Sequence, residues 1–87
     1  MLAKFQTPHK VVGVKQCRKA IEDGRAAQCC IACDADAEIQ KLFLQLCRSQ
    51  TVPVCQEYTR EQLGHACGID VKAAVVVLLH EPKGPGQ

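Results

Sequence analysis

Residues 10–24 have the sequence KVVGVKQCRKAIEDG, and the predicted fold depends on the alternation that this stretch contains. The run at 10–12 is typical of a short β-strand, and Gly13 ends it. The apolar residues at 14–21 then recur at helical spacing until Gly24 supplies a helix stop. The stretch therefore predicts a strand that leads directly into a helix.

Further strand candidates follow along the chain. Ala27 to Cys33 is apolar except for Gln28, as expected of a strand that is buried on both faces. The stretch from Val52 to Gln56 contains Pro53, which favours an edge position. The run from Ala73 to Leu79 is the most apolar, so we expect it to lie at the centre of a sheet.

Helical signals separate these strands. Asp36 is placed as an N-cap for a helix whose apolar stripe consists of Ile39, Leu42, Phe43, Leu46 and Cys47. Thr59 and Gln62 have the spacing of a capping box, and Gly68 with Ile69 predicts a Schellman-type end for the helix between them. Alternating strands and helices predict a three-layer α/β domain over residues 1–80, and the Pro/Gly-rich segment 81–87 predicts a flexible tail.

The composition excludes several classes of protein. The chain has 87 residues, of which 47% are hydrophobic and 23% charged, with a net charge of +2, so it does not resemble a disordered segment. Its longest apolar run, 73–79, is far shorter than the roughly 20 residues that span a membrane. The first residues lack the pattern of a secretory leader, which predicts a cytoplasmic protein.

Seven cysteines are unusual for a chain of this length. Their odd number and the expected compartment favour reduced thiols that pack as small apolar side chains. Cys30 and Cys33 have C-x-x-C spacing, but both fall within the strand predicted at 27–33. Residues three apart on a strand point to opposite faces, so we expect these two thiols to stay apart. The remaining cysteines do not supply the second close pair that a zinc site requires.

Catalytic and metal-binding patterns are weak. The acidic residues at 34–38 lack the length and the central glycine of a calcium loop, and helix capping accounts for Asp36 and Glu38. His9, His65 and His80 are isolated in the sequence, and there is no Gly-rich phosphate loop. The sequence therefore predicts a protein that is not an enzyme and has no cofactor, metal site or small-molecule substrate.

Basic residues are concentrated in the first part of the chain. Residues 1–25 contain six basic residues and two acidic ones, for a charge of +4, whereas the remainder carries −2. Lys15 and Lys19 lie four residues apart on the first predicted helix, directly after Gly13. The free amides of a helix start beside two lysines would suit contact with phosphates or base edges. Charge alone leaves a plain solvated helix face open as the alternative.

Four short stretches resemble one known family. Gly13 to Ala20 fits the motif G-x-(K/N)-(Q/E)-x-x-K-A of the kink-turn RNA-binding ribosomal proteins, the large-subunit protein seven-Ae group, and is similar to its small bacterial homologues. Asp34-Ala35-Asp36 matches the acidic D-x-(D/E) of the family, and Val52-Pro53 matches its V-P strand start. The stretch from Leu63 to Ile69 matches its signature L-G-x-A-C-G-(I/V).

This resemblance implies an α/β/α sandwich with a mixed four-stranded sheet, and an RNA site at the start of the first helix. By similarity to the family, Gly13 would allow close approach to RNA, Lys15 and Gln16 would contact base edges, and Lys19 would contact bases or phosphate. The loop at 57–60 would close over a flipped-out nucleotide through Tyr58, Thr59 and Arg60, with Asp36 nearby. The implied partner is structured RNA with a kink-turn, ribosomal RNA included, and we expect a monomer that binds no membrane.

The chain departs from the family pattern around the loop at 57–60. Glu57 stands where the family usually has a small apolar residue, and Thr59-Arg60 stands where it has Ser followed by Lys or Met. Glu57 and Glu61 place negative charge near the expected phosphate path, which predicts a lower affinity for RNA. An alternative function follows from this: a protein-interaction module on the same fold with weakened RNA binding.

Overall fold

The computed structural model describes residues 9–69 and 71–80 of the chain. The elements in order are β1 (Lys10–Val12), α1 (Val14–Glu22), β2 (Ala26–Ile31), α2 (Ala37–Gln50), β3 (Val54–Cys55), α3 (Arg60–Ala66) and β4 (Val75–Leu79). The predicted alternation of strands and helices is thus confirmed. The tail predicted at 81–87 lies outside the described residues, as does the start of the chain up to residue 8.

The strands of the described residues form one sheet in the order β1-β4-β2-β3. The last strand, β4, runs antiparallel to both β1 and β2, whereas β2 and β3 are parallel. The central place predicted for the apolar run of β4 and the edge position predicted for β3 are therefore both confirmed. The directions also imply that β1, β2 and β3 all end at the same edge of the sheet, where β4 begins.

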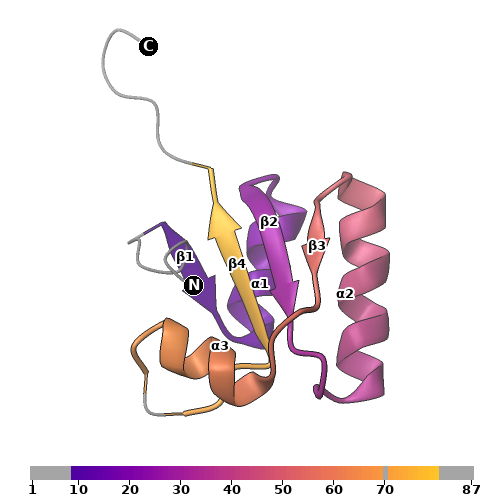
Figure 1. The fold of residues 1–87 in the computed structure, drawn as a ribbon. Helices are drawn as coiled ribbons and strands as arrows, with labels where there is room; N and C mark the ends of the chain where they lie inside the picture. The colour runs from indigo at the N-terminus through magenta and orange to yellow at the C-terminus, as the bar shows by residue number, and fades with distance from the viewer. Residues whose placement is uncertain (1–8, 70, 81–87) are drawn as a thin grey trace, which may run out of the picture.

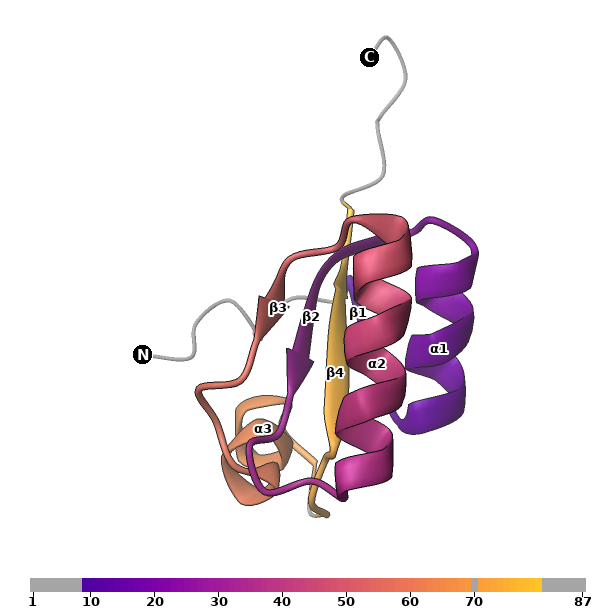
Figure 2. The same ribbon diagram turned by 90° about the vertical axis from the view of Figure 1, so that its right-hand side faces the viewer.

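Helices cover both faces of this sheet, as Figure 2 shows, with α1 and α2 on one side and α3 on the other. Side chains that alternate along β2 and β4 divide between two hydrophobic cores. Cys29, Ile31, Val75 and Val77 pack in the core with α1 and α2, and Cys30, Ala32 and Val76 pack in the core with α3. The predicted α/β/α sandwich with a mixed sheet is confirmed.

The helix ends follow local sequence signals in two cases out of the three described. Gly24 after α1 and Gly68 after α3 both have positive φ, at 74° and 75°. The amide of Ile69 donates to the carbonyl of Gly64 at 3.1 Å, which is the long hydrogen bond of a Schellman end. The end of α2 differs, because Thr51 takes the left-handed conformation with φ 54°. Such a conformation is strained for a β-branched residue.

Three strand predictions were too long; the run predicted at 73–79 forms a strand only over Val75–Leu79. The predicted strand at 27–33 ends at Ile31, and Cys33 is exposed in a turn that the amide of Ala35 closes onto the carbonyl of Ala32. The strand predicted at 52–56 is reduced to Val54–Cys55. Apolar composition extended the predictions at 27–33 and 73–79 beyond the residues that pair in the sheet.

The described cysteines are free thiols, and most of them are buried. Cys17, Cys29, Cys30, Cys47 and Cys55 lie in the core, as predicted for reduced cysteines. The prediction that Cys30 and Cys33 both lie in a strand is wrong for Cys33, but no disulfide joins them. No helix in the part of the chain that the structure describes has the length and apolar character to cross a membrane.

Candidate functional site

The helix starts of the described chain gather at one edge of the sheet. Because β1, β2 and β3 end at this edge, the helix that follows each of them begins there, at the lower edge in Figure 1. We call this the helix-start edge; it comprises Gly13 and the first turn of α1, the β2–α2 turn at 32–36 and the β3–α3 loop at 56–59. The sequence-predicted site residues come from these three segments and from the first turn of α3, except Lys19, which lies one turn further along α1.

The start of α1 depends on an unusual backbone conformation at Gly13. Its φ of 111° and ψ of 152° fall in a region that is essentially restricted to glycine. A Cβ atom built at this position would lie 2.8 Å from Oε1 of Gln16, so the Gln16 side chain lies over the glycine. Within the described chain no side chain caps α1, and its first turn has no acidic residue. The helix therefore presents uncapped amides and the positive end of its dipole at the edge.

Lys15 and Lys19 extend this positive region along α1. Both side chains are exposed, and neither forms an ion pair with a residue that the structure describes. Arg18, between them in sequence, is paired with Glu22 at 3.2 Å instead. An exposed pair of this kind contributes little stability, but it locally compensates the charge of Arg18. Among the residues that the structure describes, these two lysines of α1 are thus cations without an ion-pair partner.

The β2–α2 turn brings two carboxylates to the same edge. Asp36 occupies the N-cap position of α2 as predicted, yet its side chain accepts no hydrogen bond from the first turn, and it is exposed. Asp34 instead reaches the neighbouring loop, where its Oδ1 accepts a hydrogen bond from the backbone amide of Arg60 at 2.8 Å. This hydrogen bond and the nearby guanidinium lower the pKa of Asp34. The acidic residue that caps a helix is therefore Asp34, and the helix it caps is α3.

The β3–α3 loop is held in place by hydrogen bonds within it and across to the β2–α2 turn. Thr59 and Gln62 form the predicted capping box, with Thr59 N to Gln62 Oε1 at 2.9 Å and Gln62 N to Thr59 Oγ1 at 3.2 Å. The amide of Cys33 donates to the carbonyl of Tyr58 at 2.8 Å. Arg60 Nε lies 3.6 Å from Asp34 Oδ1, and 41% of the Arg60 side chain is exposed. Tyr58, Thr59 and Arg60 are thus only partly buried at this edge.

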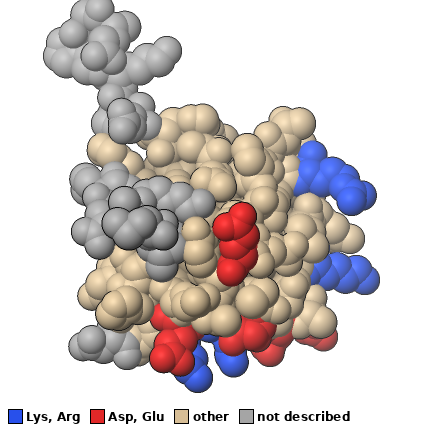
Figure 3. Space-filling model, viewed as in Figure 1, with Lys and Arg blue, Asp and Glu red and all other residues tan. Residues whose placement is uncertain are grey.

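Acidic residues also lie at the helix-start edge. Glu57 precedes Tyr58 in the loop and Glu61 lies in the first turn of α3; both are exposed, and neither is ion-paired within the described residues. Figure 3 shows acidic and basic side chains together along the lower edge of the molecule. The edge is therefore mixed in charge rather than uniformly basic.

Other parts of the described chain offer little that could hold a cofactor or a metal. Within residues 9–69 and 71–80, no three His, Cys, Asp or Glu side chains are grouped so that they could bind a metal ion. The thiol of Cys17 donates to the carbonyls of Val11 and Val75 at 3.3 and 3.5 Å, and burial raises its pKa to about 12.

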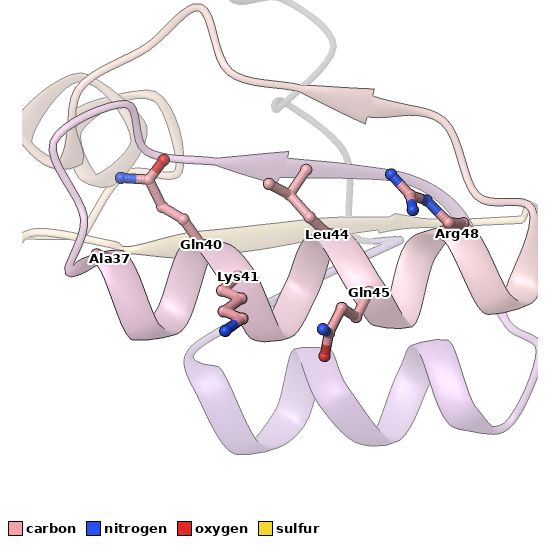
Figure 4. Close-up of a pocket in the computed structure, with 6 residues that line it drawn as sticks. All are labelled: Ala37, Gln40, Lys41, Leu44, Gln45 and Arg48. Carbon is pink, nitrogen blue, oxygen red and sulfur yellow. The ribbon is translucent and has the colours of Figure 1, made fainter.

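A groove lies along the outer side of α2, where the polar side chains Gln40, Lys41, Gln45 and Arg48 diverge around Leu44 (Figure 4). None of the sequence-predicted site residues lines it.

Two residues at or near the edge have roles that the sequence prediction missed. Asp34 lies in one of the matched family motifs but has no predicted role, because a hydrogen bond to a residue 26 positions away leaves no local pattern. Gly64 lies inside α3, where a Cβ atom would overlap the carbonyl oxygen of Val71. A glycine inside a helical pattern often has a packing reason, so this one did leave a signal.

The comparisons with known proteins agree with the resemblance that the motifs suggest. The model of the ribosomal protein L7Ae/L30e/S12e/Gadd45 family matches residues 2–84. The RNA-binding protein TTE2299 of Caldanaerobacter subterraneus subsp. tengcongensis is 39% identical over 73 residues, which cover 84% of this chain and 89% of that protein. The RNA-binding protein GWCH70_0105 of a Geobacillus species is 35% identical over 75 residues, which cover 86% of this chain and 92% of that protein.

Solved structures with the same fold are also found. The Giardia lamblia 15.5kD RNA binding protein superposes with a TM-score of 0.82 at 25% identity, covering 92% of this chain and 68% of that one. A Bacillus halodurans protein of unknown function superposes with a TM-score of 0.81 at 24% identity, covering 90% of this chain and 78% of that one. The second likeness concerns the fold alone.

Proposed function

The chain belongs to the ribosomal protein L7Ae/L30e/S12e/Gadd45 family, and from this premise we propose that it is a non-catalytic RNA-binding protein that recognises a kink-turn or a related bent internal loop. Family membership and the names of the relatives support the non-enzymatic part of this proposal. Recognition of bent, unpaired RNA by shape and by base edges suits a compact surface such as the helix-start edge.

The observation that carries the proposal is the pair of uncompensated lysines beside the uncapped start of α1. Gly13 leaves the first amides of α1 without a side-chain cap, and Lys15 and Lys19 remain without ion pairs among the described residues. Amides at a helix start and lysine ammonium groups bind phosphate oxygens well. Gln16, which lies over Gly13, carries both a donor and an acceptor for a base edge.

The loop that leads into α3 would supply the second half of the interface. Tyr58 is half-buried against the core with α3, and its exposed part would stack on an unpaired base, while the exposed part of Arg60 would offer guanidinium donors for a phosphate. The Thr59 hydroxyl accepts from the Gln62 amide, so its own proton and its second lone pair are what it could offer to RNA. Asp36 is exposed at the adjacent turn and would accept from an amino group of a flipped-out base.

Titration of the protein against a kink-turn RNA and against a plain duplex of equal length tests the proposal. We expect clearly tighter binding to the kink-turn, and equal affinity for the two RNAs would reject the proposal. Lys19→Ala should weaken kink-turn binding roughly tenfold or more, because a charge-assisted hydrogen bond contributes about 1.5–3 kcal/mol. It should also lower the salt slope by about 1.

Arg48→Ala is the matched control for Lys19→Ala. It also removes one exposed cation without an ion pair among the described residues. Arg48 lies in the last turn of α2, roughly 16 Å along the helix from Ala37 at the helix-start edge. Since the Debye length is about 10 Å at 0.1 M salt, its charge is largely screened from RNA bound at that edge. Its loss should leave affinity and salt slope nearly unchanged.

The exposed carboxylates of Glu57 and Glu61 favour a second candidate function, a protein-interaction module on the same fold with weakened RNA binding. A pull-down that survives ribonuclease treatment would support this candidate, and one that ribonuclease abolishes would reject it. We further propose that the protein acts as a cytoplasmic monomer, with ribosomal RNA among its candidate targets. Sedimentation of the free protein tests its oligomeric state.

A further inference from the structure

The β2–α2 turn and the β3–α3 loop are joined by a small set of hydrogen bonds centred on Asp34. Its Oδ1 accepts from the backbone amide of Arg60 at 2.8 Å and lies 3.6 Å from Nε of the same residue. The Cys33 amide donates to the Tyr58 carbonyl at 2.8 Å, and the Ala73 amide donates to the Arg60 carbonyl at 3.1 Å. Both ends of the segment from Tyr58 to Arg60 are thereby fixed to other parts of the fold.

We propose that Asp34 is a positioning residue for RNA binding, which holds Tyr58 and Arg60 in the orientation that the interface needs; this inference rests on the proposed function. The first amides of any helix lack partners within the helix. The capping box satisfies the amides of Thr59 and Gln62, and Asp34 satisfies that of Arg60 from outside. The start of α3, and with it the backbone that carries the Arg60 side chain, is therefore held in part by a residue of another loop.

The contact with Asp34 leaves part of the Arg60 side chain exposed. The separation of 3.6 Å between Arg60 Nε and Asp34 Oδ1 is too long for a hydrogen bond, and Nε is buried without another partner in the described residues. The hydrogen bond from the Arg60 amide to Asp34 fixes the backbone from which this side chain leaves, while 41% of the side chain stays exposed. A phosphate can then bind the exposed part of the guanidinium without displacing Asp34.

The charge and the geometry of Asp34 have opposite effects on RNA affinity, and this separates the two roles. A carboxylate near a phosphate path repels RNA. If Asp34 acted only through its charge, a variant that lacks the charge would therefore bind RNA more tightly than wild type. If Asp34 positions the loop, a variant that lacks its hydrogen bond to the Arg60 amide would bind RNA less tightly than wild type, even though the repulsion is also removed. Asn keeps an acceptor oxygen for the Arg60 amide, whereas Ala keeps none.

The experiment compares Asp34→Asn and Asp34→Ala in the full chain, with Glu38→Ala as the control. Glu38 is an exposed carboxylate in the first turn of α2, at the same edge, so its variant removes a charge without touching the loop. Amide hydrogen exchange of the RNA-free proteins is the first measurement. We expect Arg60 to exchange at least about tenfold faster in Asp34→Ala and near the wild-type rate in the other two variants.

Affinity for a kink-turn RNA is the second measurement, made well below the melting temperature with folding checked by circular dichroism. Asp34→Ala should bind at least threefold more weakly than wild type, and Asp34→Asn and Glu38→Ala equally or more tightly. Equal or tighter binding by Asp34→Ala would overturn the positioning role alone. Failure of the wild-type protein to prefer the kink-turn would overturn the proposed function and this inference with it, whatever the exchange rates.

Discussion

Replacing Gly64 by alanine should destabilise the protein, although the same change in most helices is stabilising. Gly64 is a buried residue of α3, and alanine in place of glycine inside a helix normally gains about 1 kcal/mol. Here the added Cβ would overlap the carbonyl oxygen of Val71, with the Val71 carbonyl carbon at 3.1 Å and Lys72 Cα at 3.3 Å. All three are backbone atoms, so no flexible side chain can move aside to make room.

The magnitude follows from the balance of these two effects. Overpacking costs about 1–3 kcal/mol, and a clash with main-chain atoms belongs at the upper end of this range. The chain beyond the clash is also held, because the amide of Ala73, a buried residue, donates to the carbonyl of Arg60. Subtracting the gain in helix propensity leaves a net loss of about 2 kcal/mol. For a domain of this size, that loss lowers the melting temperature by about 8–16 °C.

Thermal and urea unfolding, followed by circular dichroism, measure this change. Gly68→Ala is the matched control: Gly68 has φ 75° but no atom within 4 Å of its would-be Cβ. It should therefore lose only the roughly 1–2 kcal/mol of a left-handed backbone. A Gly64→Ala variant that melts at or above the wild-type temperature would refute the close approach of α3 to residues 71–72.

Three further predictions concern the end of α2, the loss of stability at low pH and the alkylation of the cysteines. Thr51→Gly should raise stability by about 0.5–1 kcal/mol, because glycine accepts the φ of 54° without strain; unfolding in urea measures it, and a loss would contradict it. The pKa of Asp34 is lowered on folding, so its stabilising effect is complete above pH of about 4 and is lost as the pH falls through its folded value. Melting temperatures between pH 7 and pH 2 should then fall less in Asp34→Asn than in wild type, and parallel curves would exclude the effect. Native alkylation followed by mass measurement should label exposed Cys33 first and all seven cysteines only after unfolding; rapid native labelling of Cys17, whose pKa burial raises to about 12, would contradict the buried core.

The candidate site could be predicted in its positions but not in its internal contacts. The motif from Gly13 to Lys19 located the start of α1, and the structure adds that Arg18 is paired while Lys15 and Lys19 have no ion pair with a described residue. The sequence also identified the capping box at Thr59, which the structure confirms. The bond between Asp34 and Arg60 could not be predicted, because its partners come from different loops.

The sequence by itself determined the order of strands and helices, the glycines that end α1 and α3, and the central place of the apolar strand β4. These features depend on periodicity and on residues within one turn of each other, which a single chain displays directly. Tertiary structure alone decided that β2 ends before Cys33, that Asp34 caps α3 rather than its own helix, and that Gly64 meets a distant backbone. Each of these depends on which segments the sheet brings to one edge, and that pairing is set by burial over the whole domain, which no local pattern records.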